Sequence, residues 1–319
     1  MSESRPSWVT KFLAVVRYEM FWNIRKKKFI GMLIVAFALT TLALAGAHIV
    51  NAFGGPPVEP DPDFVVGSNV GLGGFGFFLF AIVTVMNTIS AEFESGTIVP
   101  LLAKPVSRTI VFFGKLFAAF LTLLATYCFL MIYMAIGGFV VYGPQNNLHL
   151  VPLSLIGAIF STFIWISIVL LFGTLFRSSL IAALGPLGIW LGTNIIGSIL
   201  GVLAGQGWIL TYIPGTGNSG FANGGLPSQL TPTGTSVATG TDSIGSNLIN
   251  YILHPSWEVT YYKMNIEIVP GGSPQMTWSP LYSEPFSNVI LTSIAVAVIY
   301  FIVFVGISWY VFRRAQITE

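Results

Sequence analysis

The residues best suited to chemistry lie in one short charged stretch between two apolar runs, Ser90–Lys115. Glu92 and Glu94 stand near its start and Arg108 near its end, with apolar residues between them. Carboxylates and a guanidinium can orient a protein partner, and apolar side chains can fill a groove on it. The stretch therefore fits a docking element for a soluble partner. A helical hairpin that packs only on its own chain fits the composition equally well.

Patterns for covalent, nucleotide or metal chemistry are absent from the sequence. There is no G-x-x-x-x-G-K-[ST] loop, and the nearest fragment, Gly114–Leu116, lacks both the upstream glycine and the hydroxyl residue. The single cysteine, Cys128, excludes a paired-cysteine metal site, and the three histidines are scattered. We therefore expect no catalytic residue, no metal and no cofactor on this chain.

The composition assigns most of the chain to a lipid bilayer. Hydrophobic residues make up 54% and charged residues 8% of the 319 residues, with a mean hydropathy of +0.80, whereas soluble domains carry about 25% charged residues. A spanning helix needs about 20 mainly apolar residues. The sequence predicts an all-α membrane protein with six transmembrane helices, at Phe29–Phe53, Val65–Ile89, Thr109–Tyr142, Leu150–Phe176, Leu180–Ala204 and Asn288–Phe312.

The lysines and arginines indicate how these spans are oriented. Thirteen of the 14 basic residues fall on one side of a six-span arrangement, and Lys263 alone falls on the other. Because cytoplasmic loops are enriched in Lys and Arg, that side is predicted to be the cytoplasm. The sequence thus predicts a multi-pass protein of the cell (plasma) membrane with both termini cytoplasmic.

The N-terminal residues 1–28 are predicted to form a cytoplasmic tail and an interfacial helix. Apolar residues recur there at helical spacing among basic ones, which is typical of an amphipathic helix at a membrane surface. The rest of the chain is expected to comprise spans one to five at 29–204 with a docking loop at 90–108, an extracytoplasmic segment at 205–287, span six at 288–312 and a cytoplasmic tail at 313–319.

The extracytoplasmic segment has two halves of different composition. Gly215–Ser246 is rich in Gly, Ser, Thr, Asn and Pro without sustained periodicity, and is predicted to be flexible. The second half holds apolar and aromatic residues such as Leu248, Trp257 and Tyr261. It is predicted to form a short structured or membrane-dipping element.

Small and polar residues inside the spans suggest where helices meet or a substrate passes. Gly197, Gly201 and Gly205 allow close helix approach, either within the chain or across a dimer axis. No span carries a charged residue near its middle, which disfavours an ion-coupled carrier. The candidate residues for a substrate path are Phe78, Asn87, Thr193 and Asn194.

The docking stretch reads E-x-E-x-G-T, then L-L, then K-P-V-S-R, then G-K. This pattern resembles the signature of the ABC-2 type permease family, the membrane subunits of ABC exporters of the type V, or ABCG-like, architecture. Looser agreement covers the whole chain, although the long outer segment departs from the simplest members. The matching residues are Glu92, Glu94, Gly96, Thr97, Leu101, Leu102, Pro105, Val106, Ser107, Arg108, Gly114 and Lys115.

The resemblance implies the transmembrane permease subunit of an ATP-driven exporter. Its expected partners are a nucleotide-binding ATPase subunit, which would carry ATP and magnesium, a second permease chain in a homo- or heterodimer, and the lipid bilayer; no nucleic acid is expected. The resemblance assigns ATPase coupling to Glu92, Glu94, Gly96, Thr97, Leu101, Leu102, Pro105 and Arg108.

Two other classes of function compete with this interpretation. A membrane enzyme would need a convergent nucleophile–base or metal cluster, and the sequence offers none. A membrane scaffold or maturation factor would bind a cytoplasmic partner through the same loop without transport. Transport by the purified complex distinguishes the scaffold from the exporter.

Overall fold

The computed structural model describes residues 7–67, 73–95, 107–199, 207–214, 228–267 and 275–314. Among them, six helices are long and apolar enough to cross a membrane, which confirms the six-span, all-α membrane architecture. The α-helices are α1 (Trp8–Arg25), α2 (Lys27–Ala52), α3 (Phe64–Gly67), α4 (Gly73–Val85), α5 (Ser90–Glu94), α7 (Arg108–Tyr142), α8 (Val151–Phe176), α9 (Ser179–Ser198), α10 (Ile244–Leu253) and α11 (Phe286–Arg314). The remaining elements are the 3-10 helices η2 (Leu148–Leu150), η4 (Gly207–Tyr212) and η5 (Thr241–Ser243) and the strands β1 (Ser228–Thr231), β2 (Thr235–Ser236), β3 (Glu258–Glu267) and β4 (Gln275–Pro285).

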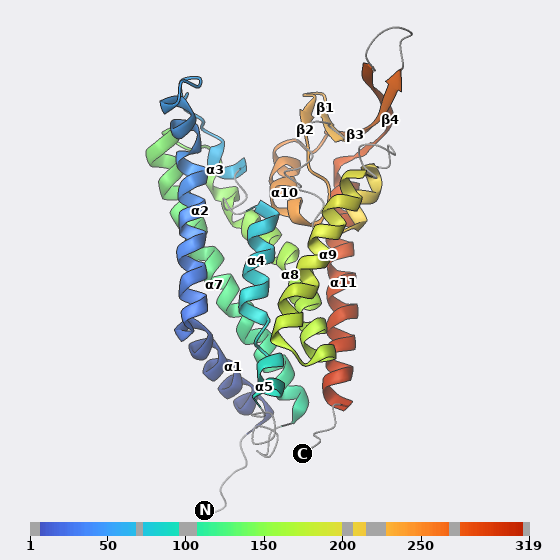
Figure 1. Cartoon of the computed structure of the whole chain (residues 1–319). Helices are drawn as coiled ribbons and strands as arrows, with labels where there is room; N and C mark the ends of the chain where they lie inside the picture. Colours follow the sequence, from blue (N-terminus) through green and yellow to red (C-terminus); the bar gives the residue numbers. More distant parts are fainter. Residues whose placement is uncertain are drawn as a thin grey trace, which may run out of the picture.

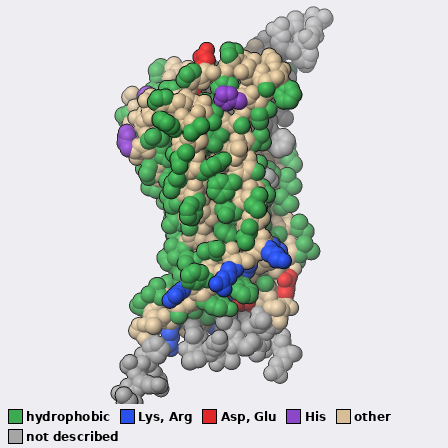
Figure 2. Space-filling view, turned by 90° about the vertical axis from the view of Figure 1, so that its left-hand side faces the viewer, with side chains coloured by type: hydrophobic (Ala, Val, Ile, Leu, Met, Phe, Trp, Pro, Cys, Tyr) green, Lys and Arg blue, Asp and Glu red, His purple; other side chains and the backbone are tan. Residues whose placement is uncertain are grey.

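The spans run between two ends of the molecule with different contents (Figure 1). Both termini lie at one end with α1 and α5, and we call it the termini end. The four strands and α10 lie at the opposite end, which we call the sheet end. Figure 2 shows a tall band of hydrophobic side chains between the two ends, with Lys and Arg side chains next to the termini end. Lys263, in β3, lies at the sheet end.

The N-terminal helix α1 is separate from the first span. Ser7 caps its start, because the Ser7 Oγ accepts a hydrogen bond from the Thr10 backbone N–H at 3.2 Å. Lys26 has an extended backbone (φ −68°, ψ 129°) that interrupts the helix before α2 begins. Figure 1 shows α1 running obliquely below α2. The predicted N-terminal helix is therefore present, and its position in the membrane interface stays a prediction.

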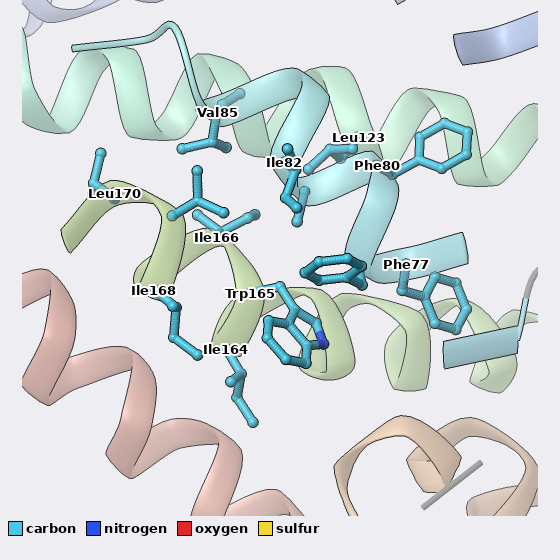
Figure 3. Close-up of a cluster of buried hydrophobic side chains, with 14 of the residues drawn as sticks. Phe77, Phe80, Ile82, Val85, Leu123, Ile164, Trp165, Ile166, Ile168 and Leu170 are labelled. Carbon is cyan, nitrogen blue, oxygen red and sulfur yellow. The ribbon is translucent and has the colours of Figure 1, made fainter. Parts of the chain in front are cut away.

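Helix α4 lies among the other spans, and its phenylalanines build much of the core. Phe77 and Phe78 are fully buried. The Phe78 ring packs edge-on against Trp165 of α8, with centroids 4.8 Å apart, and stacks on Trp190 of α9 at 5.6 Å. Figure 3 shows Trp165 and Phe77 in this cluster. Since lipid gives helices no hydrophobic reason to associate, side-chain packing of this kind holds the spans together.

The predicted span at Val65–Ile89 is only partly described. It includes most of α3 and all of α4, and residues 68–72 lie outside the described residues. Its helix ends at Val85, earlier than the predicted Ile89, and a turn leads from there into α5. The Val65 side chain fills the space beside Gly138 of α7, where an added Cβ would overlap it. Residues 64–67 therefore dock on the end of α7.

A small antiparallel sheet covers part of the sheet end, with strand order β2-β1-β3-β4. Val259 and Tyr261 of β3 are buried in a cluster with Phe286 at the start of α11. The expectation that Gly215–Ser246 is flexible is wrong for its second half, which forms β1, β2, η5 and the start of α10. The reason is burial, because Thr241–Ser243 is packed into the helix bundle.

Candidate functional site

Helix α5 carries three consecutive side chains that contact three different sets of neighbours. It follows α4 after a short turn and ends at Ser95, whose Oγ donates a hydrogen bond to the Ala91 carbonyl at 2.6 Å. Successive residues of a helix point about 100° apart. Glu92, Phe93 and Glu94 therefore leave α5 in different directions, and each meets another helix. We call α5 and these contacts the hub.

Glu92 reaches α7 and α1 through a buried lysine. The Lys115 Nζ lies 2.7 Å from Glu92 Oε1 and 2.5 Å from Glu19 Oε1 of α1. The Lys115 side chain is 4% exposed, and the second oxygen of Glu92 is buried without a hydrogen-bond partner. A buried charge is tolerated only with a partner. The three charges therefore tie α1, α5 and α7 together.

Glu94 reaches the start of α9. Its two carboxylate oxygens accept hydrogen bonds from the backbone N–H and the Oγ of Ser179, both at 2.6 Å. Ser179 is the first residue of α9, where backbone N–H groups lack intrahelical partners and the helix dipole is positive. Glu94 is thus a cap for α9 that another helix supplies.

Phe93 completes the hub on the side of α11. The Arg177 guanidinium lies over the Phe93 ring at 5.3 Å, and the Phe312 ring meets it edge-on at 6.2 Å. Arg108, at the start of α7, donates a hydrogen bond from Nη1 to the Arg313 carbonyl at 3.0 Å. The residues that flank positions 96–106 therefore contact α1, α7, α9 and α11.

A cleft of about 1040 Å³ opens beside the hub between α1, α5, α7 and the start of α9. Asn87, Trp22 and Lys26 line it together with the buried ion pairs. Burial lowers the pKa of Lys26, an effect that the nearby Glu19 carboxylate opposes. The Lys26 ammonium donates a hydrogen bond to Asn23 Oδ1 at 3.0 Å. The lining of the cleft therefore combines charges of both signs with apolar side chains.

Three of the four predicted path residues, Phe78, Thr193 and Asn194, contact Trp190, and Asn87 lies elsewhere. Phe78 is buried in the core and does not line the cleft. On α9, the Thr193 hydroxyl and the Asn194 side-chain amide both donate to the Trp190 carbonyl, at 3.1 and 2.7 Å. Asn87 lies apart from them, in the cleft. A role of these four residues in a substrate path stays a prediction.

Part of the predicted docking and packing set lies outside the described residues. Of the predicted glycines on span five, Gly197 is buried in α9. The site residues that fall outside the described ranges are Gly96, Thr97, Leu101, Leu102, Pro105, Gly201 and Gly205.

Three residues that complete the hub, namely Glu19, Arg177 and Ser179, are not among the site residues predicted from the sequence. A signal for Glu19 was present, because it is the only acidic residue in the sequence of α1. A signal for Ser179 was present too, since two serines follow Arg177 directly before the fifth apolar run. The contacts themselves join residues 85 and 96 positions apart, and one sequence does not specify such pairs.

The fold and the hub define a polytopic membrane protein whose charged contacts gather at one end of a six-helix bundle. In the described part of the chain, no group of three or more His, Cys, Asp or Glu residues is arranged to hold a metal ion. The model of the family described as ABC-2 family transporter protein matches residues 16–192, more than half of the chain. The chain therefore belongs to the ABC-2 transporter family and is a transport permease of that family. No curated protein gives a significant match.

The matched region runs from α1 into α9 and contains Glu19, Glu92, Glu94 and Lys115. It confirms the resemblance drawn from the docking stretch. It ends before residue 205, so the segment that builds the sheet end and span six lies beyond the matched residues.

Proposed function

We propose that this permease is the membrane subunit of an ATP-driven ABC exporter and couples to a separate ATPase subunit. The ATPase subunit would bind ATP and magnesium, and two permease chains would form the substrate path between them. Membership of the ABC-2 transporter family supports transport as the activity. Coupling is inferred from the hub, and export from the resemblance of the docking stretch to the ABC-2 type permeases of exporters.

The observation that carries the proposal is the connection of one short helix to four others. Glu92 links α5 to α1 and α7, Glu94 links it to α9, and Phe93 links it to α11. An ATPase that docks on residues 96–106 would push or pull α5 directly. Since these contacts are ion pairs, charged hydrogen bonds and packed rings, they would transmit the movement to the spans.

The charge distribution supports a cytoplasmic location for the hub in a plasma membrane. The described basic residues other than Lys263 belong to elements of the termini end. Cytoplasmic segments of membrane proteins carry an excess of Lys and Arg. An ATPase in the cytoplasm would then meet residues 96–106 and the mixed-charge cleft beside the hub.

Coupling can be tested without knowing the transported substrate. We would purify the permease with the ATPase subunit that accompanies it in native membranes, reconstitute the complex in vesicles and measure ATP hydrolysis. The Glu94→Gln variant keeps the shape of the side chain but removes its charge from the start of α9. We expect permease-dependent ATP hydrolysis to fall about two- to fivefold, with the complex intact.

The matched control is Glu59→Gln, which neutralises an exposed glutamate at the sheet end and should leave hydrolysis unchanged. Equal hydrolysis in the Glu94→Gln variant and the wild type would contradict the coupling role of the hub. If the ATPase subunit hydrolyses ATP at the same rate alone and together with the permease, the result would instead favour the hypothesis that the protein is a membrane scaffold.

A further inference from the structure

One carboxyl group is buried in the bundle although it belongs to no span. Asp242 lies in η5, between β2 and α10, and is 1% exposed. Its neighbour Thr241 is held by α8, because the Ser161 Oγ donates to the Thr241 carbonyl at 2.6 Å. Asn247 fixes the same segment, since its side-chain amide donates to the Ala238 carbonyl at 2.9 Å. Asp242 is thus part of a tightly packed insertion.

This insertion reaches well below the end of the bundle. Ser161 lies ten residues along α8 from Val151 at the sheet end, which corresponds to about 15 Å of helix. Gly157, on the preceding turn, touches Gly245 of α10 so closely that an added Cβ would overlap the Gly245 backbone. A hydrocarbon core is about 30 Å thick. The Asp242 carboxyl therefore sits at a depth where water is scarce.

The elements that pack on η5 provide no positive charge for this carboxyl. They are α4, α8, α10 and α11. Helices α4 and α8 contain no titratable side chain, and α10 contains only Tyr251. Helix α11 adds Tyr300 and Tyr310, and its Arg313 and Arg314 lie at its far end, at the termini end of the molecule. A carboxylate at Asp242 would therefore lack a nearby cation on any of these helices.

Polar groups near Asp242 compensate a negative charge only in part. Burial raises the pKa of Asp242 from 3.8 to about 7, and hydrogen bonding from Thr241 and Trp165 limits the rise. The Trp165 indole N–H makes no hydrogen bond of good geometry, although it is fully buried. Figure 3 shows that the indole nitrogen is turned away from the aliphatic cluster labelled on the same helix.

We propose that Asp242 is a proton-binding site that holds η5 and α10 in the bundle when it is protonated. The neutral carboxylic acid fits the apolar surroundings. When its O–H releases the proton to water at the sheet end, the remaining carboxylate draws η5 toward solvent and loosens α10 from α8. The ligand is thus a proton, and the response is the docking of the sheet-end insertion.

The direction of the pH effect follows from the two protonation states. The carboxyl has a higher pKa in the docked state than in water, so docking binds a proton and is favoured by acid. The stabilisation of the docked state by the bound proton is complete below pH 3.8 and is lost as the pH rises through about 7. Between these limits, each pH unit changes the docking equilibrium by up to about tenfold.

The test is hydrogen exchange of the full-length protein in lipid nanodiscs, followed by mass spectrometry at pH 5.5 and pH 8.5. The Asp242→Asn variant keeps the shape of the neutral acid and cannot ionise. Comparing variant and wild type at the same pH cancels the intrinsic pH dependence of exchange. We expect slower exchange of Ile244–Leu253 in the variant than in the wild type at both pH values, and the ratio of the wild-type rate to the variant rate should grow about thirtyfold from pH 5.5 to pH 8.5.

Asp63→Asn is the matched control, because Asp63 is an exposed aspartate at the same end of the molecule. It should follow the wild type at both pH values. The proposal would be overturned if the ratio of the exchange rates of α10 in the wild type and in Asp242→Asn did not change with pH. Loss of α10 protection in that variant at pH 5.5 would overturn it too. If the variant does not fold, the exchange rate of α10 relative to that of α2 is followed against pH in the wild type. A ratio that stays constant with pH overturns the proposal. The measurement needs no ATPase, so its failure would leave the exporter proposal untouched.

Discussion

Lys115 holds two carboxylates at the point where α1, α5 and α7 meet. Its ammonium is within 2.7 Å of both Glu19 and Glu92. Buried ion pairs add little stability over apolar packing, yet removal of one partner is costly because the other charge stays buried. At the residue scale, the hub is therefore sensitive to single substitutions and tolerant of combined ones.

The Lys115→Met variant should be strongly destabilised. It leaves Glu19 and Glu92 buried side by side without their cation, and the loss is on the order of 3–5 kcal/mol. We expect the thermal unfolding midpoint in detergent to fall by several degrees, while Lys27→Met, at an exposed lysine, changes it little. Adding Glu19→Gln and Glu92→Gln to Lys115→Met should restore part of the loss. Equal midpoints for the two single lysine variants would show that the ion pairs do not hold these helices together.

The hub also shows how far sequence reasoning reaches at this scale. Glu92 and Glu94 stand out because charge is rare in this chain, and the permease motif contains both. Their functions as an ion-pair partner and a helix cap require Glu19 and Ser179, which come from distant helices. Asp242 lies in a segment that the sequence predicts to be flexible, since nothing in a run of Gly, Ser and Thr indicates that the segment packs into the bundle.

At the element scale, the spans were predictable, whereas for the sheet end the sequence predicted a structured element around Leu248, Trp257 and Tyr261 but not its strands or its packing. Six apolar runs give six helices because the bilayer requires each spanning backbone to satisfy its own hydrogen bonds. The shape of the sheet end depends instead on contacts among segments far apart in the sequence. Its insertion on α8 relies on one close approach between two glycines, Gly157 and Gly245.

Gly157→Ala should displace α10 from α8. The new methyl group would meet the backbone of Gly245, which cannot move aside as a flexible side chain can, and overpacking of this kind costs about 1–3 kcal/mol. We expect faster hydrogen exchange across Ile244–Leu253 at every pH. Gly46→Ala on α2 is the control, since nothing lies within 4 Å of an added Cβ there. Unchanged exchange in the Gly157→Ala variant would mean that the two helices can separate slightly without loss of docking.

At the scale of the whole molecule, α9 presents a surface that the single chain leaves uncovered. Leu184, Leu191 and Ile195 are exposed along it, and an added Cβ at Gly188 or Gly192 would meet no neighbour within 4 Å. Two small residues four positions apart let helix backbones approach closely in lipid. This surface supports the proposed pairing of two permease chains through α9.

Gly192→Leu should separate the two permease chains without unfolding either one. An added Cβ at Gly192 meets no neighbour within 4 Å in the single chain, and a leucine side chain there would hold a second helix away from α9. Gly31→Leu is the matched control, because Gly31 on α2 is equally open and both variants add the same side chain to a surface helix. We expect the Gly192→Leu protein to shift from dimer to monomer mass in native mass spectrometry from nanodiscs, with its thermal midpoint unchanged, and the Gly31→Leu protein to stay dimeric. If both variants remain dimeric, the chains pair through another surface. If both become monomeric, the effect comes from added bulk in the bilayer and gives α9 no special part in pairing.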